Sequence, residues 1–72
     1  HVVGYDKSYG FVTVNIGAKD GMKKNMVLAI MRDGRLVAKA RIRQLRDTFS
    51  AATVIQNSAR SEIRAGDKIT IV

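Results

Sequence analysis

Residues 26–45 read MVLAIMRDGRLVAKARIRQL, and this run largely determines which class of fold the chain can adopt. The Asp-Gly pair at positions 33 and 34 separates two runs of strand-forming residues, which is a strong signal for a two-residue β-hairpin. The run over 26–31 is apolar throughout, so it predicts a strand buried on both faces, with a short helix as the alternative. The run over 35–45 alternates between apolar and charged residues. Its predicted inner face comprises Leu36, Ala38, Ala40 and Ile42, and its predicted outer face comprises Arg35, Val37, Lys39, Arg41 and Arg43.

The same period-two alternation recurs along the rest of the chain. Further strands are predicted at 2–6, 11–16, 49–55 and 68–72, with turns at 7–10, 17–25, 47–48 and 66–67. Val12, Val14 and Ile16 share a face and are expected to point into the core, because a one-residue slip would expose all three. In the last strand, Ile69 and Ile71 are expected to point inward.

Two segments are predicted to lack strands. The turn over 17–25 contains Gly17, Gly21 and Asn25, residues that can take positive φ without strain. The polar segment 56–65 is predicted to be irregular, with room for one helical turn. These segments leave six short strands in 72 residues.

Six short strands are too few for two large packed sheets, but they can curl into one barrel that hides its edges. We therefore predict a single all-β domain over 1–72, a small closed or partly open barrel of the OB-like or SH3-like kind. It should contain five to six short, mainly antiparallel strands. The chain has no Cys, which excludes disulfides and thiolate metal sites, and no Pro to interrupt strand pairing.

The sequence offers little for catalysis. The only histidine is His1, at the terminus, and the five aspartates lie mostly in predicted turns, where Asp is common for local hydrogen bonding. Neither a metal-ligand cluster nor a glycine-rich phosphate loop is present. We therefore predict that the domain is not an enzyme and has no catalytic residues, metal or cofactor.

Charge is the strongest lead to a partner. Thirteen Lys and Arg against six Asp and Glu give a formal net charge of +7, which favours nucleic acid or another acidic partner. The candidate basic surface comprises Arg35, Lys39, Arg41 and Arg43 on one strand, with Lys19, Lys23 and Lys24 in the long turn. Strand neighbours two apart lie about 6.6–6.8 Å from each other, close to the step between phosphates along a nucleic-acid strand.

The alternative is a solvated strand face kept charged to prevent edge pairing. Val37 interrupts the basic stripe, and no aromatic residue is interleaved with it, although nucleic-acid-binding barrels usually offer rings beside their cations. Phe11 is the candidate stacking platform, because alternation directs it away from the core.

Four segments resemble a family of small β-domains. Residues 11–24 (FVTVNIGAKDGMKK), 32–39 with 50–55, and 63–69 are similar to the C-terminal domain of flagellar assembly protein T and related bacterial cell-envelope domains. The shared motifs are mostly turn residues, and Asn25 stands where the family usually has Gly, a change that Asn tolerates in left-handed backbone. The resemblance implies a location in the periplasm or envelope and a role in assembly or scaffolding. It carries over no binding residue.

Two functional hypotheses follow. The first is a non-enzymatic interaction or structural module, at the C-terminus of a longer envelope protein whose gene should encode a signal sequence or membrane anchor upstream. Its partner would be another envelope protein. The second is a cytoplasmic nucleic-acid-binding barrel that uses the basic strand 35–43. No apolar run approaches the ~18 residues of a membrane span.

Overall fold

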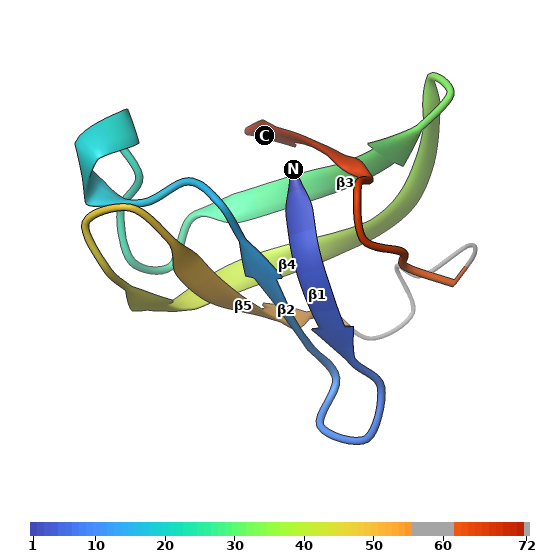
Figure 1. Cartoon of the computed structure of the whole chain (residues 1–72), viewed down its shortest axis with the longest axis horizontal. Helices are drawn as coiled ribbons and strands as arrows, with labels where there is room; N and C mark the ends of the chain where they lie inside the picture. Colours follow the sequence, from blue (N-terminus) through green and yellow to red (C-terminus); the bar gives the residue numbers. More distant parts are fainter. Residues whose placement is uncertain (56–61, 72) are drawn as a thin grey trace.

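One antiparallel sheet accounts for the strands of the computed structural model, which describes residues 1–55 and 62–71. The strands are β1 (Val2–Asp6), β2 (Phe11–Val14), β3 (Val27–Arg32), β4 (Arg35–Leu45), β5 (Ser50–Val54) and β6 (Lys68–Ile71), with one 3-10 turn, η1 (Ala18–Asp20). Their order across the sheet is β1-β2-β5-β4-β3-β6. The sheet curls into a partly open barrel, as the bent path of β4 in Figure 1 shows. The prediction of a single all-β, partly open barrel is confirmed.

Strands β1 and β4 agree with the sequence prediction at both ends, and β2 and β6 agree at their first residue, whereas β3 spans 27–32 and not the predicted 26–31. The second strand is shorter than predicted: it ends at Val14, and Asn15 and Ile16 lead into the η1 loop. Strand β5 likewise begins at Ser50 and ends at Val54. The helical turn predicted within 56–65 falls mainly on residues outside the described range, as does Val72.

The Asp-Gly pair forms the predicted hairpin between β3 and β4. Arg32 pairs with Arg35, and the two residues between them have φ values of 53° for Asp33 and 77° for Gly34. Positive φ at both central residues defines the type I′ turn, whose twist matches that of the flanking strands. The segment before the pair is therefore a strand and not a helix.

Strand β3 is buried on one face only, which corrects the prediction of burial on both. Leu28 and Ile30 are inaccessible to solvent. The alternate residues Val27, Ala29 and Met31 lie on the outer face and are partly exposed. No other layer covers that face among the described residues, because the chain forms a single sheet.

Strand β4 departs from simple alternation at Val37. Ile30 pairs with Ala38, but the next residue, Met31, pairs with Leu36, so Val37 is the extra residue of a β-bulge. Val37 and Ala38 are consequently both buried. The bulge explains three errors in the predicted faces: Val37 is in the core, Leu36 faces outward with Met31, and Arg35 lies on the face opposite Lys39 and Arg41.

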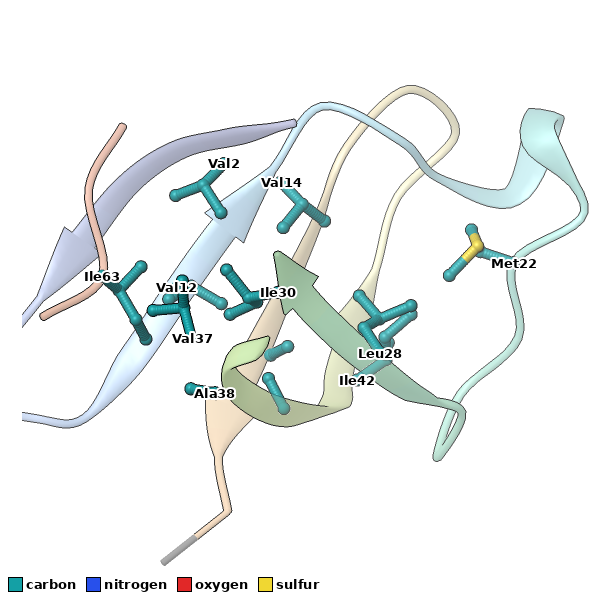
Figure 2. Close-up of a cluster of buried hydrophobic side chains, with 12 residues drawn as sticks. Val2, Val12, Val14, Met22, Leu28, Ile30, Val37, Ala38, Ile42 and Ile63 are labelled. Carbon is teal, nitrogen blue, oxygen red and sulfur yellow. The ribbon is translucent and has the colours of Figure 1, made fainter. Parts of the chain in front are cut away.

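The core fills the concave side of the curled sheet. Figure 2 shows side chains from β1 to β4 converging there, with Met22 from the long loop and Ile63 from the segment before β6. The buried apolar residues are Val2, Val12, Val14, Met22, Leu28, Ile30, Val37, Ala38, Ala40, Ile42, Ala52 and Ile63. The prediction for Val12 and Val14 is confirmed, and Ile16 and Ile69 pack against this core. Ile71 shares the inner face with its partner Leu28, yet it is 49% exposed because β6 lies at the open edge of the barrel.

The start of β1 meets the residues before β6 and partly closes the barrel. The Val2 N–H donates to the Asp67 carbonyl, and the Gly66 N–H donates to the Val2 carbonyl, each at 2.8 Å. The Asp67 carboxylate is buried and accepts two hydrogen bonds from Arg32, both 2.8 Å long, and one of 2.9 Å from the Arg64 N–H. The Arg32 hydrogen bonds are the main cause of the lowered pKa of Asp67. This ion pair ties the last segment of the chain to β3.

Gly17 has a different role from the one predicted. Its φ is −148°, which any residue can adopt, so positive φ is not the reason for glycine here. Gly17 is buried, and a Cβ at this position would lie 2.2 Å from the Arg46 carbonyl oxygen. Glycine is required because the η1 loop passes directly over the β4–β5 loop. Gly21 and Asn25 do take positive φ, at 84° and 70°, as predicted.

Candidate binding surface

A row of outward-facing residues crosses the convex side of the sheet. Phe11 on β2 pairs with Thr53 on β5, Thr53 pairs with Arg41 on β4, and Arg41 pairs with Val27 on β3. Residues that pair across antiparallel strands share a face, and neighbouring strands are about 4.8 Å apart. The backbones at Phe11 and Arg41 are therefore roughly 10 Å apart on one surface. The structure places an aromatic residue within reach of the basic strand, which the sequence pattern did not indicate.

An open, largely apolar depression lies beside this row, which we call the Phe11 depression. It is lined by Phe11, Arg43, Gln44, Ala51 and Thr53. The residues of β5 that line it, Ala51 and Thr53, are small, and Phe11 is partly exposed. Tyr9, which is 79% exposed, lies next to Phe11 with ring centroids 6.4 Å apart and planes inclined by 33°.

A second depression, the basic depression, adjoins the first. It is lined by Lys24, Arg43, Gln44, Leu45 and Arg46. Arg43 and Gln44 line both depressions, so the two form one continuous surface. Neither Lys24, Arg43 nor Arg46 forms a salt bridge with an acidic residue in the part of the chain that the structure describes.

Arg43 reaches both depressions because of a second bulge in β4. Ile42 pairs with Ala52, but Gln44, and not Arg43, pairs with the preceding residue, Ala51. The bulge inserts Arg43 as an extra residue at the sheet surface, where such irregularities commonly redirect a side chain. Beyond it, Leu45 returns to the inner side of the sheet opposite Ser50.

The other predicted basic residues do not form one stripe. Arg41 and Lys39 face outward on β4, where Lys39 pairs with Ala29. Arg35 is at the opposite end of β4 and lines a separate depression beside the hairpin turn, together with Arg32 and Asp33. Of the three loop lysines, Lys24 lines the basic depression, while Lys19 and Lys23 are exposed and line neither depression. The bulge at Val37 therefore separates Arg35 from the other predicted cations of β4.

Three further residues of this surface were not predicted from the sequence: Arg46, Gln44 and Tyr9. Arg46 had a usable signal, since it continues the dense run of cations that begins at Arg41. Tyr9 is separated from Phe11 only by Gly10, but the proximity of the two rings depends on the conformation of the turn over 7–10. Gln44 becomes outward-facing only because of the preceding bulge.

The acidic residues are not arranged for metal binding. No group of three or more His, Cys, Asp or Glu residues converges within residues 1–55 and 62–71. The buried carboxylate of Asp67 is occupied by Arg32 and the Arg64 N–H, so its perturbed pKa reflects a structural ion pair. Over the same residues, none of the helical structure has the length and apolar character needed to cross a membrane.

The fold and surface together define a small, basic, all-β barrel domain with an aromatic and cationic outer face. Comparison with models of known protein families, with curated proteins and with solved structures found no match in any of the three.

Proposed function

We propose that this domain is a non-enzymatic interaction module that binds an acidic partner through the outer face of its sheet at Arg43. The observation that supports the proposal most directly is that Arg43 joins the Phe11 depression to the basic depression. Three cations gather at this one place on a domain of net charge +7. A surface with this charge attracts acidic ligands over a distance and orients them as they approach.

Hydrogen bonding within the fold supports an external role for these cations. The Arg32 guanidinium is engaged with Asp67 and with the Glu62 carbonyl, and therefore has a structural role. The side chains of Arg43 and Arg46 have no such partner among the described residues. Their positive charges are therefore available to a ligand without the loss of an internal ion pair.

The resemblance of residues 11–24, 32–39, 50–55 and 63–69 to bacterial envelope domains supports an assembly or scaffold role in the periplasm or cell envelope. On this proposal the domain is a C-terminal module of a longer protein. Sequencing of the complete gene and fractionation of cells that express it test the location. We expect a signal sequence or membrane anchor upstream and recovery with the envelope; a cytoplasmic full-length protein without either would contradict the location.

The binding surface is tested by titrating heparin and poly-L-glutamate into the domain at low and near-physiological salt, followed by NMR amide shifts. We expect the largest shifts at Lys24, Arg43 and Arg46. The variant Arg43→Gln should weaken binding several-fold and reduce the slope of log Kd against log salt by about one. The matched control is Arg35→Gln, which removes the same charge from the other end of β4.

Equal weakening by the two variants would contradict the proposal, because it would show that net charge and not this surface governs binding. Absence of binding to both polymers at low salt would also contradict it.

A further inference from the structure

The outer face carries an accessible aromatic ring next to its cations. We propose that the acidic partner is a single-stranded nucleic acid, with a base stacked on Phe11 and the adjacent phosphates held in the basic depression by Arg43, Lys24 and Arg46. This inference rests on the binding surface of the proposed function and not on the envelope location.

The Phe11 depression is open, largely apolar and lined by an aromatic ring, which suits the binding of a flat base. Phe11 is only partly buried, and its neighbours Ala51 and Thr53 on β5 are too small to cover the ring. Stacking of bases on aromatic side chains is the main sequence-tolerant contact in single-strand recognition. Tyr9, with its ring centroid 6.4 Å from that of Phe11, extends the aromatic surface for a neighbouring base.

The position of Arg43 fits the composition of a nucleotide. Each nucleotide presents a flat base and a phosphate within one unit, and Arg43 lines both the Phe11 depression and the basic depression. Its planar guanidinium matches a phosphate through two parallel hydrogen bonds. Arg41 precedes Arg43 by two residues on β4 and lies about 10 Å from Phe11 across Thr53, so it supplies a further cation along the same side of the Phe11 depression.

The partly exposed ring of Phe11 distinguishes among acidic partners. A duplex keeps the faces of its bases within the stack, so it offers Phe11 nothing to stack on. An acidic peptide offers carboxylates to the cations, but a chain of aspartate and glutamate has no flat ring for the apolar depression. Of these three partners, only an unpaired strand offers both a flat ring to the Phe11 depression and phosphates to the basic depression.

The test is a set of fluorescence anisotropy titrations with three probes of equal length, about a dozen nucleotides. The probes are oligothymidylate, an abasic phosphodiester that has the same charge without bases, and a DNA duplex. We expect oligothymidylate to bind more tightly than the abasic strand, on the order of tenfold per stacked base. The duplex should bind no better than the abasic strand.

Variants of Phe11 assign this preference to the ring. Phe11→Leu preserves apolar volume without an aromatic face and should abolish the preference for oligothymidylate, whereas Phe11→Trp should preserve it. Phe49→Ala is the control, because Phe49 is a more exposed phenylalanine, at 47%, that lines neither depression. Circular dichroism of each variant verifies the fold.

The inference would be overturned if the domain bound oligothymidylate and the abasic strand with equal affinity, or if Phe11→Leu bound oligothymidylate as tightly as the parent protein does. Either result would leave the proposed acidic-ligand surface in place. Tighter binding of poly-L-glutamate than of oligothymidylate would also overturn the inference and would identify the partner as an acidic protein. If the domain bound none of these probes and did not bind heparin, the proposed function would be contradicted as well.

Discussion

Replacing Gly17 by Ala tests how the long loop is held against the barrel. An added Cβ would lie 2.2 Å from the Arg46 carbonyl oxygen and 2.7 Å from the Phe49 nitrogen, inside the 3.0 Å below which Cβ contacts essentially never occur. Both neighbours are backbone atoms, so no side-chain rotation relieves the overlap. The two loops must move apart.

The cost follows from the hydrogen bonds that this movement breaks. The Ala18 N–H donates to the Arg46 carbonyl at 2.8 Å, the Lys19 N–H donates to the Asp47 carbonyl at 3.0 Å, and the buried Ser50 hydroxyl donates to the Ile16 carbonyl at 2.6 Å. Each such bond contributes about 1 kcal/mol net. Loss of two or three lowers the free energy of unfolding by about 2–3 kcal/mol, which corresponds to a fall in Tm of roughly 10–20 °C for a domain of this size.

Thermal unfolding followed by circular dichroism, with urea denaturation for the free energy, measures the effect. Gly4→Ala is the matched control: Gly4 lies in β1, has no atom within 4 Å of an added Cβ, and does not have positive φ. That variant should unfold within about 0.5–1 kcal/mol of the parent. If Gly17→Ala were as stable as Gly4→Ala, the close loop contact would not exist in solution and the reasoning would be refuted.

Three further predictions concern stability. The ion pair with Arg32 lowers the pKa of Asp67, so the Asp67 carboxylate stabilises the fold at pH values above its ordinary pKa of about 3.9. This stabilisation is lost as the pH falls through the lower pKa of the folded state. Urea denaturation between pH 7 and pH 2 should show that Asp67→Asn is less stable than the parent at neutral pH and loses less stability on acidification. An unchanged pH dependence would contradict the assignment. Leu28→Ala should cost about 2–5 kcal/mol because Leu28 is fully buried, whereas Val3→Ala, at a 52% exposed position, should cost under about 1 kcal/mol; similar values would place the core elsewhere. Gly34→Ala should cost about 1–2 kcal/mol, because φ is 77° there, and a neutral result would argue against the type I′ turn.

Local chemistry predicted much of the fold. The Asp-Gly pair specified the β3–β4 hairpin because positive φ at two successive residues is a property of those residues themselves. Alternation placed Val12 and Val14 in the core, since side chains on a regular strand alternate between faces without reference to distant residues. The same holds for the left-handed conformation of Asn25.

The candidate surface was predicted less well, because it depends on pairing between distant segments. A bulge places two residues of one strand opposite one residue of its partner, so the bulge at Val37 depends on how β4 pairs with β3, and the bulge at Arg43 on how it pairs with β5. They buried Val37, separated Arg35 from the other cations and placed Arg43 between the two depressions. Alternation alone does not reveal where a strand contains an extra residue.

The sequence by itself determined the all-β class, the turns and the excess of positive charge, because these depend on each residue and its immediate neighbours. Only the tertiary structure decided that Phe11 lies across Thr53 from Arg41, that Arg32 pairs with Asp67, and that Gly17 must lack a side chain. Each of these depends on contacts between residues far apart in the chain. Such contacts are fixed by the curl and register of the whole sheet, which no local pattern records.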